Sequence, residues 1–123
     1  MIWCSACIST PVNPSETVVD RNIEVRLKVP DMGWRIRIEE IHRMGGELWV
    51  ISSLHRHPGM AAQAITTISD NIRMRLPDGP VQHVIVGKTW KWENREPYMF
   101  INDWEEIRSR LKSGQMLYQK IAD

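Results

Sequence analysis

Three stretches of the sequence alternate apolar and charged residues with a period of two. They are residues 23–29 (IEVRLKV), the first half of residues 34–44 (WRIRIEEIHRM) and residues 71–77 (NIRMRLP). Successive side chains of a β-strand point to opposite faces of a sheet, so each stretch predicts a strand with one apolar face. A chain with several such stretches and little helical periodicity is expected to be mainly β.

A β-hairpin is predicted in the middle of the chain. Residues 34–44 and 47–54 are joined by a Gly-Gly pair, and such a connection between two β-rich stretches is a strong hairpin signal. The alternation slips at Glu39 and Glu40, which predicts a β-bulge. Residues 47–54 (ELWVISSL) have apolar residues at both odd and even positions, so both faces of the strand would be apolar. We therefore expect them to form a central strand.

Two further stretches are expected to be strands. Residues 60–68 end in a β-branched cluster, and residues 81–92 (VQHVIVGKTWKW) contain Gly87 as a candidate bulge. The pattern thus predicts about five strands joined by short turns. Because no helix separates the strands, we expect antiparallel pairing and no parallel sheet. The predicted fold is an antiparallel β-sandwich or a small barrel, with a C-terminal α-helix.

The helix is expected at residues 102–113. Asn102 is the predicted N-cap and Glu105 stands three residues later, which is close to a capping box. Gly114 follows as a C′ residue. We expect the apolar face of this helix to dock near Trp90 or Trp92, and residues 115–121 to add one more amphipathic turn.

The chain is expected to contain a flexible N-terminal tail, residues 1–22, and a single β domain, residues 23–123. The apolar strand faces supply the predicted core, which consists of Ile23, Val25, Leu27, Trp34, Ile36, Ile38, Val50, Ile72, Met74, Leu76, Val84 and Val86.

Composition excludes several classes of function. With 16 basic and 15 acidic residues among 123, the net charge is +1, which gives no electrostatic footprint for nucleic acid. No apolar stretch approaches the roughly 18 residues of a membrane span, so no transmembrane segment is expected. No motif for a cofactor is present, and we expect none to be bound.

The cysteines, Cys4 and Cys7, permit several interpretations. Trp-Cys-x-x-Cys is similar to the thioredoxin redox motif, but the strand and helix that this motif requires are not predicted around it. The pair could supply half of a zinc site. Alternatively, CSAC resembles the end of a lipoprotein signal, with Cys7 as the lipidated residue and a polar tether after it. That interpretation requires a basic and apolar segment upstream of Met1. It places the protein in the cell envelope, and the cytoplasm is expected otherwise. An inert tail is the remaining alternative.

His55 and His57 would share one face of a strand, which raises the question of a metal site or a catalytic base. Neither a third ligand nor a nucleophile stands nearby in the sequence, so the favoured interpretation is an ordinary polar strand end before Pro58. Trp90 and Trp92 form a candidate aromatic binding surface, alone or together with the histidines.

Residues 33–87 resemble the C-terminal domain of PrcB-like proteins, which are bacterial, often exported and named for association with a protease complex. The segments that carry the resemblance are GWRIRIEEI, ELWVISSLHRHPGM and QAITT. Pro58, Gly59, Gln63 and Thr66 fill the family's connection between two strands. The resemblance implies a non-enzymatic β domain of the cell envelope that binds a protease or another protein.

The sequence therefore predicts a non-catalytic binding or accessory module, with a protein as its partner. The alternative is a metal- or thiol-dependent enzyme built from Cys4, Cys7, His55 and His57.

Overall fold

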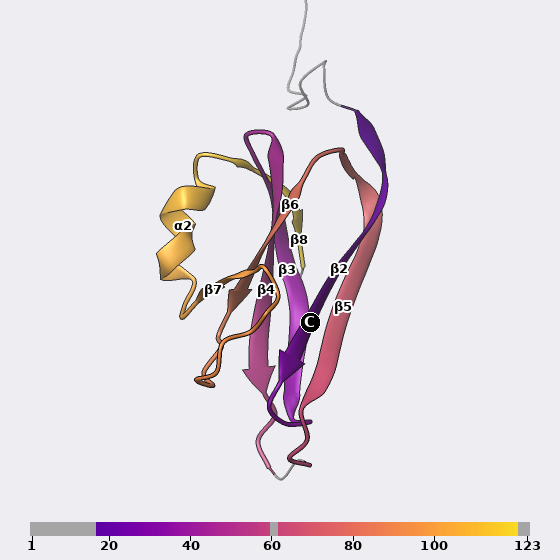
Figure 1. Ribbon diagram of the computed structural model, residues 1–123. Coiled ribbons are helices and arrows are strands. Elements are labelled where there is room, and N and C mark those ends of the chain that lie inside the picture. Colours follow the sequence, from indigo (N-terminus) through magenta and orange to yellow (C-terminus); the bar gives the residue numbers. More distant parts are fainter. Residues whose placement is uncertain (1–16, 60–61, 121–123) are drawn as a thin grey trace, which may run out of the picture.

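The computed structural model describes residues 17–59 and 62–120, which form seven strands and one helix (Figure 1). In chain order the elements are β2 (Val18–Val29), β3 (Trp34–Met44), β4 (Glu47–Arg56), β5 (Thr66–Pro77), β6 (Val81–Val86), β7 (Met99–Ile101), α2 (Glu105–Leu111) and β8 (Gln115–Gln119).

The strands form two sheets that pack in a sandwich-like manner. β2 pairs with β5 along its whole length, and the other sheet has the order β7-β6-β4-β3-β8. Figure 1 shows the β2–β5 ribbon on one face of the five-stranded sheet and α2 on the opposite face. The prediction of a mainly β fold is confirmed. Neither sheet closes on itself, so the small-barrel alternative is wrong.

The main core lies between the two sheets. The alternation along β2 works as predicted: Ile23, Val25, Leu27 and Val29 are buried, while the residues between them are exposed. Of the twelve predicted core residues, ten are buried. Ile72 and Met74 of β5 are half-buried and pack against that core.

The predicted hairpin and its bulge are both present. β3 pairs antiparallel with β4, and the register shifts between Ile38 and Glu40. Ile38 belongs to the core between the sheets, and after the shift Ile41 takes that place. The bulge therefore turns the following alternate residues, Glu40 and His42, toward the face that carries α2.

The prediction that no parallel pairing occurs is wrong. β6 lies parallel to β4, and β7 lies parallel to β6. Parallel neighbours need a long crossover connection, which is commonly a helix. Here β5 is the crossover: the chain leaves β4, forms β5 in the other sheet and returns as β6. A connection made of a strand carries no helical periodicity, which is why the pattern did not reveal it.

Two predicted strand boundaries also change. Residues 66–77 form one continuous strand, because β5 follows β2 over its entire length. The strand expected at 81–92 ends at Val86. Gly87 has φ +109°, and a Cβ on it would lie 2.5 Å from the carbonyl oxygen of Leu54. The chain leaves the sheet there and forms a long loop, residues 87–98, before β7.

The helix is shorter than predicted and is not C-terminal. α2 spans Glu105–Leu111. The carboxylate of Glu106, in its first turn, accepts hydrogen bonds from the backbone N–H groups of Asn102 and Asp103. The predicted capping box with Glu105 is therefore wrong. The extra amphipathic turn is also wrong, because β8 is a strand that pairs with residues 40–43 of β3.

The helix docks on a different surface from the one expected. Ile107 and Leu111 are buried in a second apolar cluster with Trp49 and Ile51 of β4 and with β6. Trp90 packs against the other core, so the predicted seat near Trp90 or Trp92 is wrong.

The expected tail boundary at residue 22 also differs from the structure. β2 begins at Val18, where its register with β5 begins opposite Pro77. The strand therefore includes residues 18–22. Cys4 and Cys7 lie outside the described residues.

Candidate binding sites

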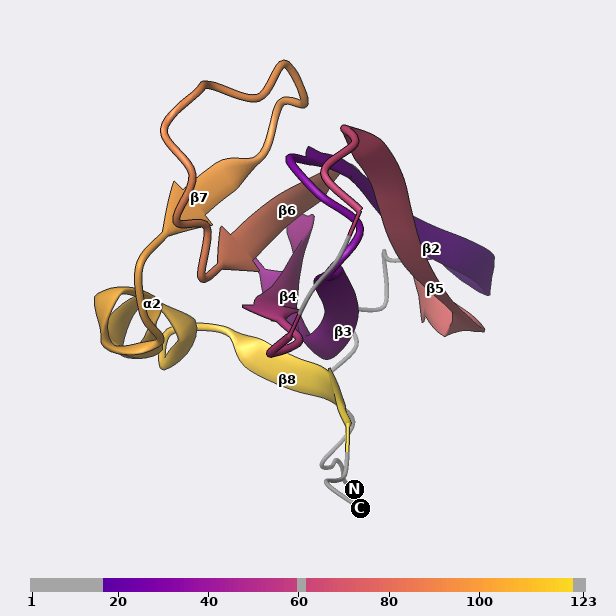
Figure 2. The same ribbon diagram turned by 90° about the horizontal axis from the view of Figure 1, so that it is seen from below.

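The β6–β7 loop, residues 87–98, is fastened to the free edge of β2 by three of its side chains. The Lys28 N–H donates to Glu96 Oε2 at 2.9 Å, and the Lys28 carbonyl accepts from Asn94 Nδ2 at 2.9 Å. The Arg26 N–H donates to the hydroxyl of Tyr98 at 3.3 Å. β2 pairs with β5 on its other edge, so these side chains occupy backbone groups that would otherwise be open to an added strand. Figure 2 shows this loop beside the end of the β2–β5 ribbon.

Three indoles lead from the core to the surface of this loop. Trp34 is buried, and Trp90 meets it edge-on with ring centroids 5.0 Å apart. Trp92 lies 5.5 Å from Trp90 and is 39% exposed. The Trp90 N–H donates to Asn94 Oδ1, so Asn94 links the stack to β2. The exposed ring of Trp92 is thus held in place by a packed and hydrogen-bonded support.

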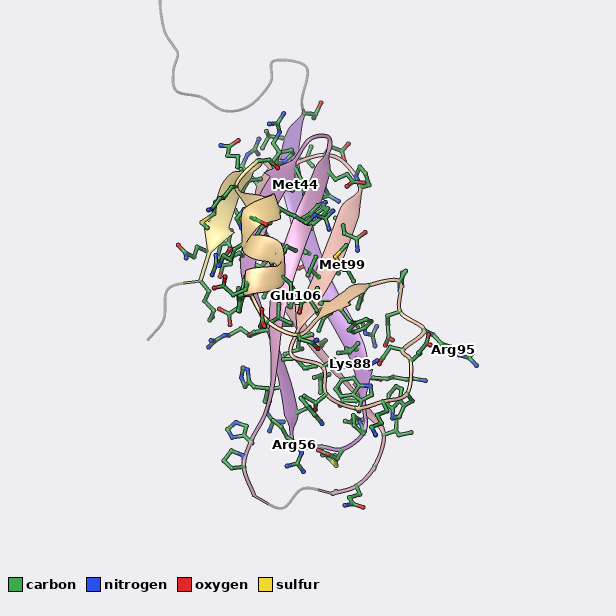
Figure 3. All side chains as sticks on the ribbon, turned by 90° about the vertical axis from the view of Figure 1, so that its left-hand side faces the viewer. Met44, Arg56, Lys88, Arg95, Met99 and Glu106 are labelled. Atoms are coloured by element: carbon green, nitrogen blue, oxygen red, sulfur yellow. The ribbon has the colours of Figure 1, made fainter. Side chains whose placement is uncertain are left out.

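A pocket of about 470 Å³ opens beside the exposed indole. It is lined by Lys28, Trp92, Glu93, Asn94, Arg95 and Glu96. This volume lies within the roughly 300–1,000 Å³ typical of ligand pockets. Figure 3 shows Arg95 on the outer rim of the loop, pointing away from it, whereas Lys88 lies within the loop. The Lys88 ammonium stands over the rings of Trp90 and Phe100, at 5.7 and 5.0 Å from their centroids.

A buried polar pair lies on the other face of the five-stranded sheet. His42 Nε2 is 2.7 Å from Glu40 Oε1, and both side chains are about 5% exposed or less. The second carboxylate oxygen accepts from Arg108 Nη1 of α2 at 3.3 Å. An ionised carboxylate can only accept hydrogen bonds, so in a pair with ionised Glu40 the donor is Nε2–H of His42. No described residue supplies a partner for His42 Nδ1, which is buried.

A second pocket, of about 350 Å³, borders His42. Its lining consists of His42, Arg108, Leu111, Lys112, Gly114 and Met116. Arg108 is half-exposed and also stacks on Trp104, 4.6 Å from the ring centroid. A side chain at Gly114 would clash with the backbone, because its Cβ would lie 2.5 Å from the Arg43 carbonyl oxygen.

Other titratable groups are shifted by their surroundings. Burial lowers the pKa of His83, whose ring lies 4.8 Å from that of Tyr98. Burial alone would raise the pKa of Glu39, but hydrogen bonds from Ser53 and Arg37 outweigh it and hold that pKa below its ordinary value.

The two histidines that were considered as a metal site or a catalytic base lie at one end of β4. His55 and His57 are exposed at the end of β4, and the His57 N–H donates to the Gly33 carbonyl. Within the described part of the chain, no three His, Cys, Asp or Glu residues converge as metal ligands. The interpretation of these histidines as an ordinary polar strand end stays a prediction. Trp90 and Trp92 lie next to each other, and Trp92 lines a pocket. That these rings form a binding surface stays a prediction.

Sequence reasoning missed the Glu40–His42–Arg108 cluster. One signal was available: after a bulge, residues 40 and 42 share a face, so a carboxylate and an imidazole meet there. Nothing in the pattern revealed that Arg108 would join them from α2 or that Asn94 and Glu96 would bind the edge of β2.

Comparison with known proteins finds no matching family model, no matching curated protein and no matching solved structure. The resemblance to PrcB-like domains therefore stays a prediction. Among residues 17–59 and 62–120, no helix has the length and apolar character needed to cross a bilayer.

Proposed function

We propose that the chain is a non-catalytic binding module that holds a partner protein through the Trp92 pocket. The observation that carries the proposal is the exposed indole of Trp92, which is supported by Trp90 and Trp34 and borders a preformed pocket. A site that is ordered before binding loses little conformational entropy when the partner arrives.

The residues around the pocket fit a protein partner. Tryptophan and arginine are enriched among the residues that dominate binding energy at protein interfaces, and Trp92 and Arg95 are both exposed here. Lys28 and Glu93 add charges of both signs to the pocket lining. A polar rim of this kind is typical of protein interfaces, whereas a highly charged ligand would need charges of one sign. The loop side chains already occupy the edge of β2, so the partner would insert a side chain into the pocket and would not add a strand there.

The resemblance to PrcB-like proteins extends the proposal to the partner and the compartment. We place the partner in the bacterial cell envelope and expect a protease or another envelope protein. A lipid on Cys7 would tether the domain there.

Site-specific photo-crosslinking tests the proposal. A photoreactive phenylalanine derivative replaces Trp92 in the host organism, and the control places it at Ile65, which is 69% exposed and does not line the pocket. We expect a protein to be cross-linked from position 92 and not from position 65. Trp92→Ala should weaken the binding of that purified protein by roughly 2 kcal/mol or more, as at a hot spot.

Trp92→Phe is the matched variant and should retain part of the affinity, because it keeps an aromatic ring. Identical cross-links from both positions, or an affinity unchanged by Trp92→Ala, would contradict the proposal.

A further inference from the structure

Of the five tryptophans in the described part of the chain, three have a cation of the chain over their rings. The pairs, with the distance from the cation to the ring centroid, are Lys88 on Trp90 at 5.7 Å, Arg108 on Trp104 at 4.6 Å and Arg110 on Trp49 at 4.8 Å. Trp92 is exposed, and no lysine or arginine among residues 17–59 and 62–120 stands over its ring. The face of an indole attracts cations through its quadrupole. Trp92 therefore offers a ring on which a cation from another molecule can stack.

The pocket beside Trp92 contains two carboxylates that can pair with such a cation. Glu93 and Glu96 both line it, and neither forms an ion pair with a described residue. Glu96 accepts from the Lys28 N–H through Oε2, which leaves Oε1 outside that hydrogen bond. Glu93 is exposed. A hydrogen bond between a carboxylate and a cationic donor is stronger than one between neutral groups, so these side chains favour a charged donor.

The cations of the pocket wall do not cancel the two carboxylates. Arg95 belongs to the lining but points away from the loop (Figure 3), which leaves Lys28 as the cation of the wall. The carboxylates of Glu93 and Glu96 against the one ammonium of Lys28 give a net charge of −1. A cation is therefore attracted to the pocket more strongly than an anion.

We propose that the partner side chain that enters the Trp92 pocket is basic, an arginine or a lysine. Its cation stacks on the exposed indole and pairs with the carboxylate of Glu93. This inference rests on the proposed function and adds the chemistry of the contact: the partner protein presents an exposed basic residue to this loop.

Titration of the ¹⁵N-labelled full chain with short peptides tests the inference. The probes are Gly-Arg-Gly and Gly-Lys-Gly with acetylated and amidated ends, and the controls are the corresponding peptides with norleucine or glutamate in the middle. Norleucine keeps the unbranched apolar stem of lysine without its charge. The Trp92 indole N–H signal is identified by its loss in Trp92→Phe. We expect the two basic peptides to shift this signal saturably, and the control peptides to shift it much less.

Substitution of Glu93 tests the ion pair. Glu93→Gln should weaken the binding of both basic peptides about two- to fivefold, as expected when an exposed ion pair loses one charge. Glu105→Gln is the matched control, because Glu105 is also exposed but lies in the first turn of α2 and does not line the pocket. It should leave the affinity unchanged.

Substitution of Trp92 tests the stacking. Trp92→Leu keeps an apolar side chain and removes the aromatic face, so it should also weaken the binding of the basic peptides. The backbone amide signals of residues 87–98 report the affinity of this variant.

The inference is overturned if the basic peptides bind no better than the norleucine peptide, or if Glu93→Gln and Glu105→Gln have equal effects. Either result leaves the proposed function intact when the protein cross-linked from position 92 still loses affinity with Trp92→Ala. Conversely, selective binding of the basic peptides together with no cross-linked protein would refute the proposed function and support the preference of the pocket for a cation.

Discussion

The imidazole of His42 and the carboxylate of Glu40 meet at 2.7 Å on the same strand, and both side chains are buried. Residues two apart on a strand share a face, so β3 itself brings them together. The bulge decides which face this is, and it turns the pair away from the main core toward α2. Arg108 then reaches the pair from the helix.

Removing the carboxylate should destabilise the protein strongly. Glu40→Ala leaves His42 without its hydrogen-bond acceptor and Arg108 without its ion-pair partner, so we expect a loss of about 3–5 kcal/mol in the free energy of unfolding. Urea denaturation measures the loss. Glu105→Ala is the control: this side chain is exposed in the first turn of α2 and should cost about 1 kcal/mol or less. Equal losses in the two variants would show that the buried pair has no special role.

The helix should be held by its apolar side chains. Ile107 is 1% exposed in the cluster with Trp49 and Val84, so Ile107→Ala should cost about 2–5 kcal/mol. Hydrogen exchange checks the docking directly. In the wild-type protein we expect the amides of Ile107 to Leu111 to be protected about as well as those of the strands. Exchange at random-coil rates, or an equal loss in the exposed control Ser109→Ala, would contradict docking on the sheet.

Local features of this fold were predictable where one residue pattern decided the outcome. The alternation in β2 identified Val25 and Leu27 as core residues. If the opposite face of the strand were buried instead, Arg26 would lie between the sheets. The Gly-Gly pair fixed the β3–β4 hairpin, since its geometry depends on few residues.

Features that depend on distant contacts were not predictable in this way. The residues of β8 show helical as well as strand character, and only the free edge of β3 makes them a strand. The parallel pairing of β6 with β4 follows from β5 joining β2, a choice that no local pattern records. The candidate sites share this limit: Trp92 was visible as an aromatic residue, but Arg108 reaches Glu40 across 68 residues of sequence.

Gly87 should tolerate no side chain. Its φ of +109° is unfavourable for L-residues, and a Cβ would lie 2.5 Å from a backbone oxygen, which cannot move aside as a flexible side chain would. We expect Gly87→Ala to lower the free energy of unfolding by about 1–3 kcal/mol or more. Gly46→Ala is the matched control, since no atom lies within 4 Å of its Cβ position. Thermal unfolding of both variants measures the difference, and a Gly87→Ala variant as stable as Gly46→Ala would refute this account.

The stability of the protein should depend on pH through His83. Burial lowers the pKa of this imidazole below its ordinary value of 6.5, so between those two values the unfolded chain binds a proton that the folded protein does not. Stability rises with pH wherever the unfolded state holds more protons. The contribution of His83 to the free energy of unfolding is therefore constant at pH values above 6.5. It is lost progressively as the pH falls through 6.5 toward the lowered pKa of the folded protein.

His83→Phe keeps an aromatic ring against Tyr98 and removes the titration. The free energy of unfolding of this variant, measured by urea denaturation from about pH 7.5 to about pH 5, should fall less on acidification than that of the wild type. His55→Asn is the control, because His55 is exposed and its substitution should leave the slope unchanged. If His83→Phe and the wild type lose stability in parallel across this range, the buried imidazole does not couple folding to pH.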